Sequence, residues 1–272
     1  MNFKGWEKVS LVEWPDKICS IVFVGECNFY CPWCYNQGLA RWPENLADIK
    51  EEDVLVYLKE NQKFLDGVMI SGGEPLKIDK SWQKDLLKFI QSVRDLGLAT
   101  GVETNGSNPE FLEYLLKNKL LDYVAMDVKA PISSKFSKNF DTKLSVPPNP
   151  PAGGEGGLPI GARSPNNKAV FKNKYSELAG TEVDLNKIKK SISLIKELAP
   201  DYEFRTTVVP GLLEIEDIYQ IAEELQGAKR YYLQEFEGRA VENWPCQAYL
   251  KGVAQDLEKK FQGYFGTFKV RA

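Results

Sequence analysis

The sequence predicts a single α/β domain, 1–272, in which parallel strands alternate with outer helices. Six short apolar runs recur along the chain, and segments with helical spacing separate them, as in strands joined by crossover helices. The length of 272 residues is also that of many one-domain α/β barrels. Periodicity alone leaves two architectures open, an open sheet and a barrel.

The predicted strands span residues 18–24, 67–70, 98–102, 122–126, 203–209 and 230–234. Helical spacing is clearest in two sets of apolar residues, the first being Trp82, Leu86, Leu87, Ile90, Val93 and Leu96, and the second Leu185, Ile188, Ile192 and Ile195. Strict alternation of the two kinds of segment favours a parallel sheet covered by helices.

One stretch departs from this alternation. Between residues 147 and 165, eleven of nineteen residues are proline or glycine. Such a segment buries too little apolar area to offset the entropy lost on ordering, so we interpret residues 145–174 as a disordered insertion within the domain. We expect a flexible surface loop without function, and a docking segment for a partner is the alternative.

Composition argues against several classes of partner. The formal net charge is -3 and charged residues make up 27% of the chain, which predicts no basic patch for nucleic acid or anionic lipid. No stretch approaches the roughly 18 to 20 apolar residues of a membrane span, and the first residues lack the apolar core of a secretion signal. We therefore expect a cytoplasmic protein with neither nucleic acid nor membrane as a partner.

Three of the five cysteines fall within the eight residues CNFYCPWC, 27–34, in a chain without histidine. This spacing is too tight for an ordinary disulfide framework and suggests thiolates in a reducing compartment. A structural zinc site needs four Cys or His ligands, but Cys19 precedes the group on a predicted strand and Cys246 is isolated.

Iron–sulfur chemistry accounts better for an incomplete ligand set. Three spare core thiols fit poorly, because Asn28, Pro32 and Asn36 mark a loop rather than a packed strand. A 4Fe–4S cluster normally takes four thiolates, so a cluster held by three keeps one iron open to a substrate.

The CxxxCxxC motif in the loop after the first strand resembles that of the radical S-adenosylmethionine (SAM) superfamily, with Cys27, Cys31 and Cys34 at its ligand positions. The resemblance implies one 4Fe–4S cluster whose open iron binds the amino and carboxylate groups of SAM. One electron then cleaves the sulfonium to give methionine and a 5′-deoxyadenosyl radical. It also implies a partial (β/α)6 TIM-type barrel with a side opening. Trp33 matches the aromatic position of the motif, where it could equally serve packing.

Further motifs follow the next predicted strands. In SGGEP, 71–75, Gly72 and Gly73 allow a sharp approach of the backbone to a ligand. The resemblance implies that backbone groups and Glu74 meet the amino end of SAM. ETNG, 103–106, and MDVKAP, 126–131, end the third and fourth strands. Barrels place active sites at the C-terminal ends of their strands, and the candidates at this rim are Cys27, Gly72, Glu74, Glu103, Asn105, Asp127, Lys129 and Arg205.

The chemical groups of SAM suggest roles for these side chains. Arg205 has forked donors that suit a carboxylate, and a salt bridge to Asp127 or Glu103 is the alternative. Lys129 supplies a second, more mobile cation. Glu103, Asn105 and Asp127 offer oxygens to the ribose, to Lys129 or to a bound monovalent or divalent cation.

Nearly the whole chain, apart from the insertion, resembles the glycyl-radical activating enzymes, and specifically the long form of the activating proteins of anaerobic ribonucleoside-triphosphate reductase. The opening GWEKVSLVEWPDKICSIVFVGECNFYCPWCYN, together with TNG, MDVKAP and VVPG, carries this resemblance. It implies that the substrate is a glycine α carbon in a partner enzyme, that the partner is anaerobic ribonucleotide reductase, and that reduced flavodoxin or a similar protein donates the electron.

Two positions depart from the family pattern. Asp16 stands where glycine is usual, and Tyr35 stands where a histidine follows the last cysteine. Tyr35 can still offer backbone and aromatic contacts to adenine. Some activating enzymes also place a histidine on the last strand, and Gln234 or Glu235 is expected to cover that region here.

Two other functions remain open. One is a radical SAM enzyme that acts on a small molecule and resembles 7-carboxy-7-deazaguanine synthase. The other is a non-catalytic iron–sulfur carrier, which would leave the glycine and acidic motifs at the strand ends without a purpose.

Overall fold

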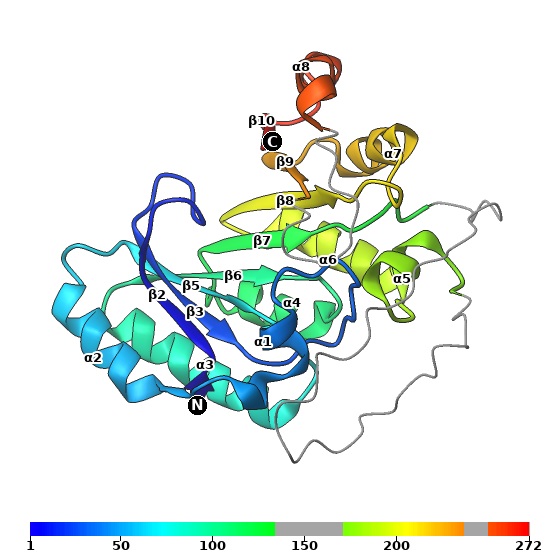
Figure 1. The fold of residues 1–272 in the computed structure, drawn as a ribbon. Helices are drawn as coiled ribbons and strands as arrows, with labels where there is room; N and C mark the ends of the chain where they lie inside the picture. Colours follow the sequence, from blue (N-terminus) through cyan, green and yellow to red (C-terminus); the bar gives the residue numbers. More distant parts are fainter. Residues whose placement is uncertain (134–170, 237–249, 272) are drawn as a thin grey trace.

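The computed structural model describes residues 1–133, 171–236 and 250–271, and an eight-stranded sheet forms its centre. The order across this sheet is β10-β9-β8-β7-β6-β5-β3-β2 (Figure 1). Its strands are β2 (Gly5–Ser10), β3 (Cys19–Val24), β5 (Gly67–Gly72), β6 (Ala99–Thr104), β7 (Tyr123–Asp127), β8 (Asp201–Val208), β9 (Arg230–Glu235) and β10 (Thr267–Arg271). A separate two-stranded sheet pairs β1 (Asn2–Phe3) with β4 (Ile49–Lys50).

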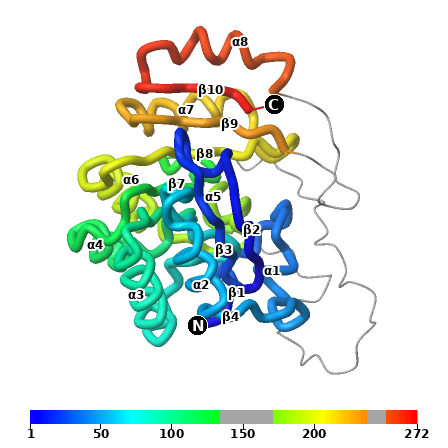
Figure 2. Tube along the Cα trace, turned by 90° about the vertical axis from the view of Figure 1, so that its left-hand side faces the viewer, coloured from blue at the N-terminus to red at the C-terminus, as the bar shows by residue number. Residues whose placement is uncertain are grey.

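Helices cover the outer face of the curved sheet. Figure 2, which looks nearly along the strands, places α3, α4, α6 and α7 on one side of it. The helices are α1 (Gln37–Arg41), the 3-10 helix η1 (Pro43–Asn45), α2 (Glu51–Asn61), α3 (Lys80–Asp95), α4 (Pro109–Lys117), α5 (Lys174–Ala179), α6 (Leu185–Leu198), α7 (Ile215–Leu225) and α8 (Leu250–Lys260).

The predicted α/β architecture with parallel strands is confirmed. The six predicted strands correspond to β3 and β5 to β9, and each pairs in parallel with its neighbour. The sheet also contains β10, parallel to β9, and β2, antiparallel to β3. Neither was predicted, because β2 (GWEKVS) and β10 (TFKVR) are partly exposed and contain no continuous apolar run.

Side-chain caps determine where several helices begin. Asp79 accepts a hydrogen bond from the Trp82 backbone N–H at the start of α3 (2.7 Å), and Asn108 and Asp184 play the same part for α4 and α6. A capping box between Glu214 and Asp217 starts α7. These caps follow strands or short loops, so each crossover helix begins close to the rim where the strands end.

Two apolar clusters stabilise the sheet from opposite faces. The larger one lies between the strands and the outer helices and includes Leu86, Phe89, Ile90 and Val93 of α3. The smaller one consists of Trp14, Cys19, Ile21, Met69, Tyr123 and Ala125. The second cluster fills the concave side of the sheet at the end away from the strand C-termini, and leaves the other end for polar groups.

Some expectations fall on residues outside the described part of the chain. Residues 145–170 of the predicted insertion and Cys246 are among them. The described chain resumes at residue 171, and the Asn173 side chain caps α5 by accepting from the Ser176 N–H at 2.7 Å. Among the described residues, no helix has the length and apolarity needed to cross a membrane.

Candidate functional site

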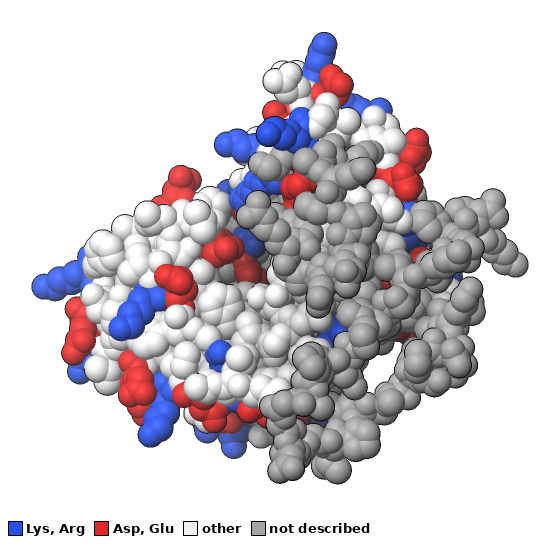
Figure 3. All heavy atoms as spheres, viewed as in Figure 1, with Lys and Arg blue, Asp and Glu red and all other residues white. Residues whose placement is uncertain are grey.

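A cavity of about 510 Å³ lies at the C-terminal ends of the strands, and such a volume suits a small-molecule ligand. Every site residue predicted from the sequence lines it: Cys27, Cys31, Trp33, Cys34, Tyr35, Gly72, Gly73, Glu74, Glu103, Asn105, Asp127, Lys129 and Arg205. Figure 3 shows acidic and basic side chains interspersed over the described part of one face of the molecule, in line with the net charge of -3. The structure thus brings motifs that follow five strands together at one cavity, and their roles in binding stay a prediction.

The cluster loop, residues 25–36, is held mainly through its backbone. Tyr30 donates its N–H to the Ala179 carbonyl at the end of α5 (2.7 Å). Arg41 Nη2 donates to the carbonyls of Tyr30 (3.1 Å) and Cys31 (3.0 Å), and Trp33 Nε1 donates to the Leu178 carbonyl (3.1 Å). The loop is thereby anchored on α1 and α5 rather than on its own cysteines.

The two glycines of SGGEP make room for the cluster loop. Gly72 has φ +113°, and a Cβ there would lie 2.4 Å from the Val24 carbonyl oxygen. A Cβ on Gly73 would lie 1.9 Å from the Glu26 carbonyl oxygen. The close approach expected from this motif is therefore to a neighbouring backbone, and it brings β5 against the loop that carries the thiols.

The three thiols share one wall of the cavity, and their chemistry suits an iron–sulfur cluster. Burial raises the pKa of Cys27 to about 12 and that of Cys31 to about 11, and it also raises the pKa of Cys34. The Phe29 N–H donates to Cys27 Sγ at 3.4 Å, a contact that favours a thiolate. Three soft sulfur donors beside an open cavity fit a cluster with three protein ligands, and iron must displace their protons on binding.

Lys129 is a cation near the thiols, and its charge lowers the pKa of all three of them against the effect of burial. Its ammonium lies 4.9 Å from the centroid of the Trp33 ring and 3.1 Å from Asp127 Oδ2. Burial lowers the pKa of Lys129, but the charges of Asp127 and Cys31 outweigh burial and the net shift is upward. A charged lysine at this position partly offsets the negative charge that the thiolates acquire with iron.

Glu74 is buried and joins two strand ends. Its Oε1 accepts from the Leu76 N–H (2.9 Å) and the Thr104 hydroxyl (2.7 Å), and its Oε2 accepts from the Asn105 N–H (2.7 Å). Burial raises the pKa of Glu74 to about 7, although these hydrogen bonds oppose the shift. Glu74 thus fixes the turn after β6 against the turn after β5.

The Asn105 side chain contacts the cluster loop directly. Its Nδ2 donates to Asn28 Oδ1 at 2.9 Å, and Asn28 Nδ2 donates to Ser107 Oγ at 2.9 Å. The amide expected to reach the ribose therefore positions the loop beside Cys27.

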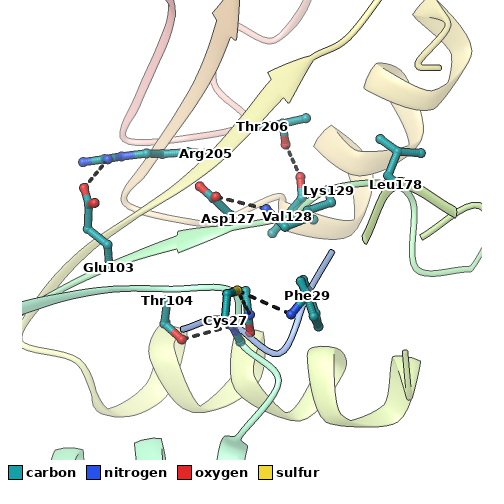
Figure 4. A network of polar contacts seen from close by, with 12 residues as sticks. Cys27, Phe29, Glu103, Thr104, Asp127, Val128, Lys129, Leu178, Arg205 and Thr206 are labelled. Carbon is teal, nitrogen blue, oxygen red and sulfur yellow. Dashed lines mark hydrogen bonds and ion pairs between the residues drawn. The ribbon is translucent and has the colours of Figure 1, made fainter. Parts of the chain in front are cut away.

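Arg205 lies on β8 among three glutamates. Its Nη1 contacts Glu103 Oε1 (2.5 Å) and Glu13 Oε2 (3.2 Å), and its Nε donates to Glu203. Figure 4 shows Arg205 and Glu103 pointing toward one another from β8 and β6. Burial raises the pKa of Glu103, but the Arg205 charge and the Ser71 hydroxyl outweigh it, so the net shift is downward. The salt bridge to Glu103, one of the partners expected for Arg205, is present, and contact of Arg205 with a carboxylate of SAM stays a prediction.

The far side of the cavity is formed by β8, β9 and β10. Thr207, Gln234, Glu235 and Arg271 line it, and this places both predicted substitutes for the missing histidine at the cavity. The Tyr35 ring stacks on Phe236 at 5.6 Å between centroids, which joins the cluster loop to the end of β9.

Several site residues escaped the sequence prediction. Ser71 stands within the quoted SGGEP motif, but its bond to Glu103 could not be read from spacing. Arg271 belongs to the unpredicted β10, and Glu13 meets Arg205 across 192 residues of chain. Among the described residues, no group of three His, Cys, Asp or Glu side chains forms a site for a single metal ion, and the predicted cation stays a prediction.

Comparison with known protein families and curated sequences gives a consistent assignment. Residues 21–135 match the model of the radical SAM superfamily. A Methanocaldococcus jannaschii protein with the provisional name glycyl-radical enzyme activating enzyme is 31% identical over 235 residues, which cover 84% of this chain and 77% of that protein. The 7-carboxy-7-deazaguanine synthase of Thermoplasma acidophilum is 32% identical over 114 residues, which cover 42% of this chain and 48% of that enzyme.

Solved structures agree in fold. Streptococcus suis SuiB, crystallised with its precursor peptide SuiA, superposes with a TM-score of 0.57 at 14% identity over 93% of this chain. Methylornithine synthase superposes with a TM-score of 0.52 at 13% identity over 92% of this chain. The chain spans 48% of the length of SuiB and 63% of that of methylornithine synthase. The match to the family model, together with the 31% identical relative, of which this chain covers 77%, shows that the chain belongs to the radical SAM superfamily.

Proposed function

We propose that this protein is an activating enzyme that generates a glycyl radical on a partner enzyme. The observation that carries the proposal is the similarity to the M. jannaschii protein with that provisional name, which extends over 84% of this chain. The cavity supports it, because the cysteines and the activase-like elements TNG and MDVKAP meet there.

The chain's own residues would hold and orient the reacting groups. Cys27, Cys31 and Cys34 would bind a 4Fe–4S cluster, and the buried Lys129 would balance part of its charge. When bound and reduced, the cluster supplies the electron that cleaves the sulfonium bond of SAM. Polar groups on β6, β7 and β8 would orient SAM, while the buried surroundings of the thiols exclude water.

A protein substrate requires an entrance for a backbone loop. The sheet ends at β2 on one side and at β10 on the other, and these two strands are not paired with one another in the described residues. This open edge supports a side entrance to the cavity. The opening motif and VVPG favour anaerobic ribonucleotide reductase as the partner, with an electron donor such as reduced flavodoxin.

The proposal is tested with anaerobically reconstituted protein, dithionite and SAM. We expect 5′-deoxyadenosine from the wild type and none from Cys31→Ala. We then expect the electron paramagnetic resonance signal of a glycyl radical when a candidate reductase is added, and no such signal when the reductase carries Gly→Ala at its radical site. Nucleoside without a radical on any glycyl-radical enzyme would refute the activase assignment while preserving SAM cleavage.

The second candidate is a radical SAM enzyme acting on a small molecule. The 32% identity to 7-carboxy-7-deazaguanine synthase favours it, although the match covers 42% of this chain against 84% for the activase relative. Such an enzyme would turn over with its small substrate and without any partner protein. An iron–sulfur carrier would cycle between oxidation states and yield no deoxyadenosine.

A further inference from the structure

The loop between β2 and β3, residues 11–18, closes the concave side of the sheet at the end opposite the strand C-termini (Figure 1). We name it the plug loop. Its Trp14 is buried and stacks on Tyr123 with 5.1 Å between ring centroids. A Cβ on Gly101 would lie 2.3 Å from Met69 Sδ and 3.1 Å from the Trp14 ring, so glycine at 101 leaves space for the indole. Trp14 therefore anchors the plug loop on the concave side of the sheet, while Leu11 and Val12 of the same loop are exposed.

Glu13, next to Trp14, reaches from the plug loop to Arg205. Its Oε2 lies 3.2 Å from Arg205 Nη1, and its backbone carbonyl accepts from Nη2 at 3.2 Å. Together with the bonds to Glu103 and Glu203, four hydrogen bonds fix a side chain that has five N–H groups. The orientation of the Arg205 guanidinium is thus set by its contacts with Glu13, Glu103 and Glu203.

Charge balance makes Glu13 important to its neighbours. Glu203 lies near two further guanidinium groups, with Arg271 Nη1 at 3.8 Å and Arg230 Nε at 4.0 Å. Glu13 and Glu103, in contrast, share Nη1 of Arg205. Without the Glu13 carboxylate, Arg205 loses one ion pair, and Glu103 no longer shares Nη1 of Arg205 with a second carboxylate. Both side chains can then shift.

Arg205 and Glu103 line the cavity, whereas Glu13 is not among the described residues that do. We propose that Glu13 is a positioning residue that sets the affinity for SAM by holding Arg205 and Glu103 at the floor of the cavity. This proposal rests on the proposed function, because it requires SAM to bind in this cavity. It assigns a role to Glu13, the residue that precedes Trp14 in the plug loop.

The test measures the dissociation constant for SAM by anaerobic equilibrium dialysis of the reconstituted protein. Glu13→Gln keeps the shape and replaces the carboxyl group with an amide, and Glu13→Ala also removes the contact. We expect each to weaken SAM binding by about tenfold or more, as is common for residues that orient a ligand-binding group. Iron content is expected to stay at the wild-type value. Glu7→Gln, on the exposed side of β2, is the matched control and should leave binding unchanged.

A double-mutant cycle separates positioning from a general loss of structure. If Glu13 acts through the fork of Arg205, Glu13→Gln should change SAM affinity less than twofold in an Arg205→Lys background, which keeps the charge and loses the fork. If the two substitutions instead weaken SAM binding independently, their fold-changes in the dissociation constant multiply in the double variant, and this outcome would overturn the proposal. If Glu13→Ala fails to fold, Glu13→Gln decides.

The outcomes distinguish this proposal from the proposed function. Wild-type binding of SAM with unchanged affinity in both Glu13 variants would overturn the role of Glu13 alone. A wild-type protein that carries its cluster and binds no SAM would overturn both.

Discussion

The cluster loop and the floor of the cavity are built on opposite principles. The cluster loop is held by hydrogen bonds to its backbone, and its three thiols extend into the cavity with raised pKa values. At the floor, Arg205 and three glutamates bind one another through their side chains. The loop thus presents thiols that can bind iron, whereas the charged side chains at the floor form ion pairs with one another.

This difference indicates which interactions stabilise each region: bonds to iron at the cluster loop, and ion pairs within the protein at the floor of the cavity. Metal–thiolate bonds are strong enough to offset deprotonation of three buried thiols, so the loop needs only a correct backbone. A charged floor must be compensated before any ligand arrives, because unpaired buried charges are costly. Mutations should therefore act on loading of the cluster in one region, and on stability and ligand affinity in the other.

The largest effect is expected for Cys31→Ala. The variant should fold and yet lose the cluster and deoxyadenosine formation, because two thiolates cannot hold the cube. Iron and sulfide content and visible absorption after reconstitution measure this. Cys19→Ala is the control, since Cys19 lies in the apolar cluster around Trp14 and should keep full cluster content. A Cys31→Ala variant that retains its cluster would contradict the dependence of cluster loading on the three thiols of the loop.

Glu74 joins the turns after β5 and β6, and its ionisation should make the unfolding free energy depend on pH. Its pKa is about 7 in the folded protein against the usual 4.5, so between these pH values the folded state holds a proton that the unfolded state has lost. The unfolding free energy should fall as pH rises from 4.5 to 7, by about 3 kcal/mol relative to Glu74→Gln. Denaturation of the iron-free proteins at several pH values measures this. A constant difference between the two proteins would mean that Glu74 is ionised throughout.

Trp33→Phe should have an intermediate effect. It leaves the buried Leu178 carbonyl without the indole N–H and weakens the contact with Lys129, at a cost of about 1 to 2 kcal/mol in unfolding free energy. Trp82→Phe is a close match, because its Nε1 donates to the Pro75 carbonyl at 2.8 Å and Lys77 lies 4.2 Å from its ring. Trp82 is less buried, so its loss should cost less in chemical denaturation of the iron-free protein. Equal losses of unfolding free energy in Trp33→Phe and Trp82→Phe would show that the hydrogen bond to α5 stabilises the protein no more than the bond made by Trp82.

The smallest effect is expected in the plug loop at Asp16, which has φ +61°. Asp16→Ala should destabilise the protein by about 1 kcal/mol, because alanine tolerates left-handed backbone less well. Asp16→Gly should be neutral or slightly stabilising. Thermal unfolding of the two variants beside the wild type measures the difference, and the reverse order would contradict the strained turn.

The sequence predicted much of the fold and of the site because both depend on local patterns. Apolar runs mark the six inner strands, and the short motifs at their ends mark the cavity. Local patterns do not predict contacts between distant residues, such as Glu13 with Arg205, because no spacing rule connects positions 192 residues apart. Asp16 departs from the glycine that is usual in the family, and the positive φ supplies the physical reason for that preference.

The anchoring of the cluster loop on α5 also has a consequence for biosynthesis. Trp33 and its acceptor Leu178 are 145 residues apart, and Gly180 packs so closely on Tyr30 that a Cβ would lie 2.1 Å from its carbonyl oxygen. The ribosome must therefore complete about two thirds of the chain before the thiol loop finds its support. Until then the three thiols of the nascent chain lack the support of α5, and assembly of the metal centre follows translation of that helix.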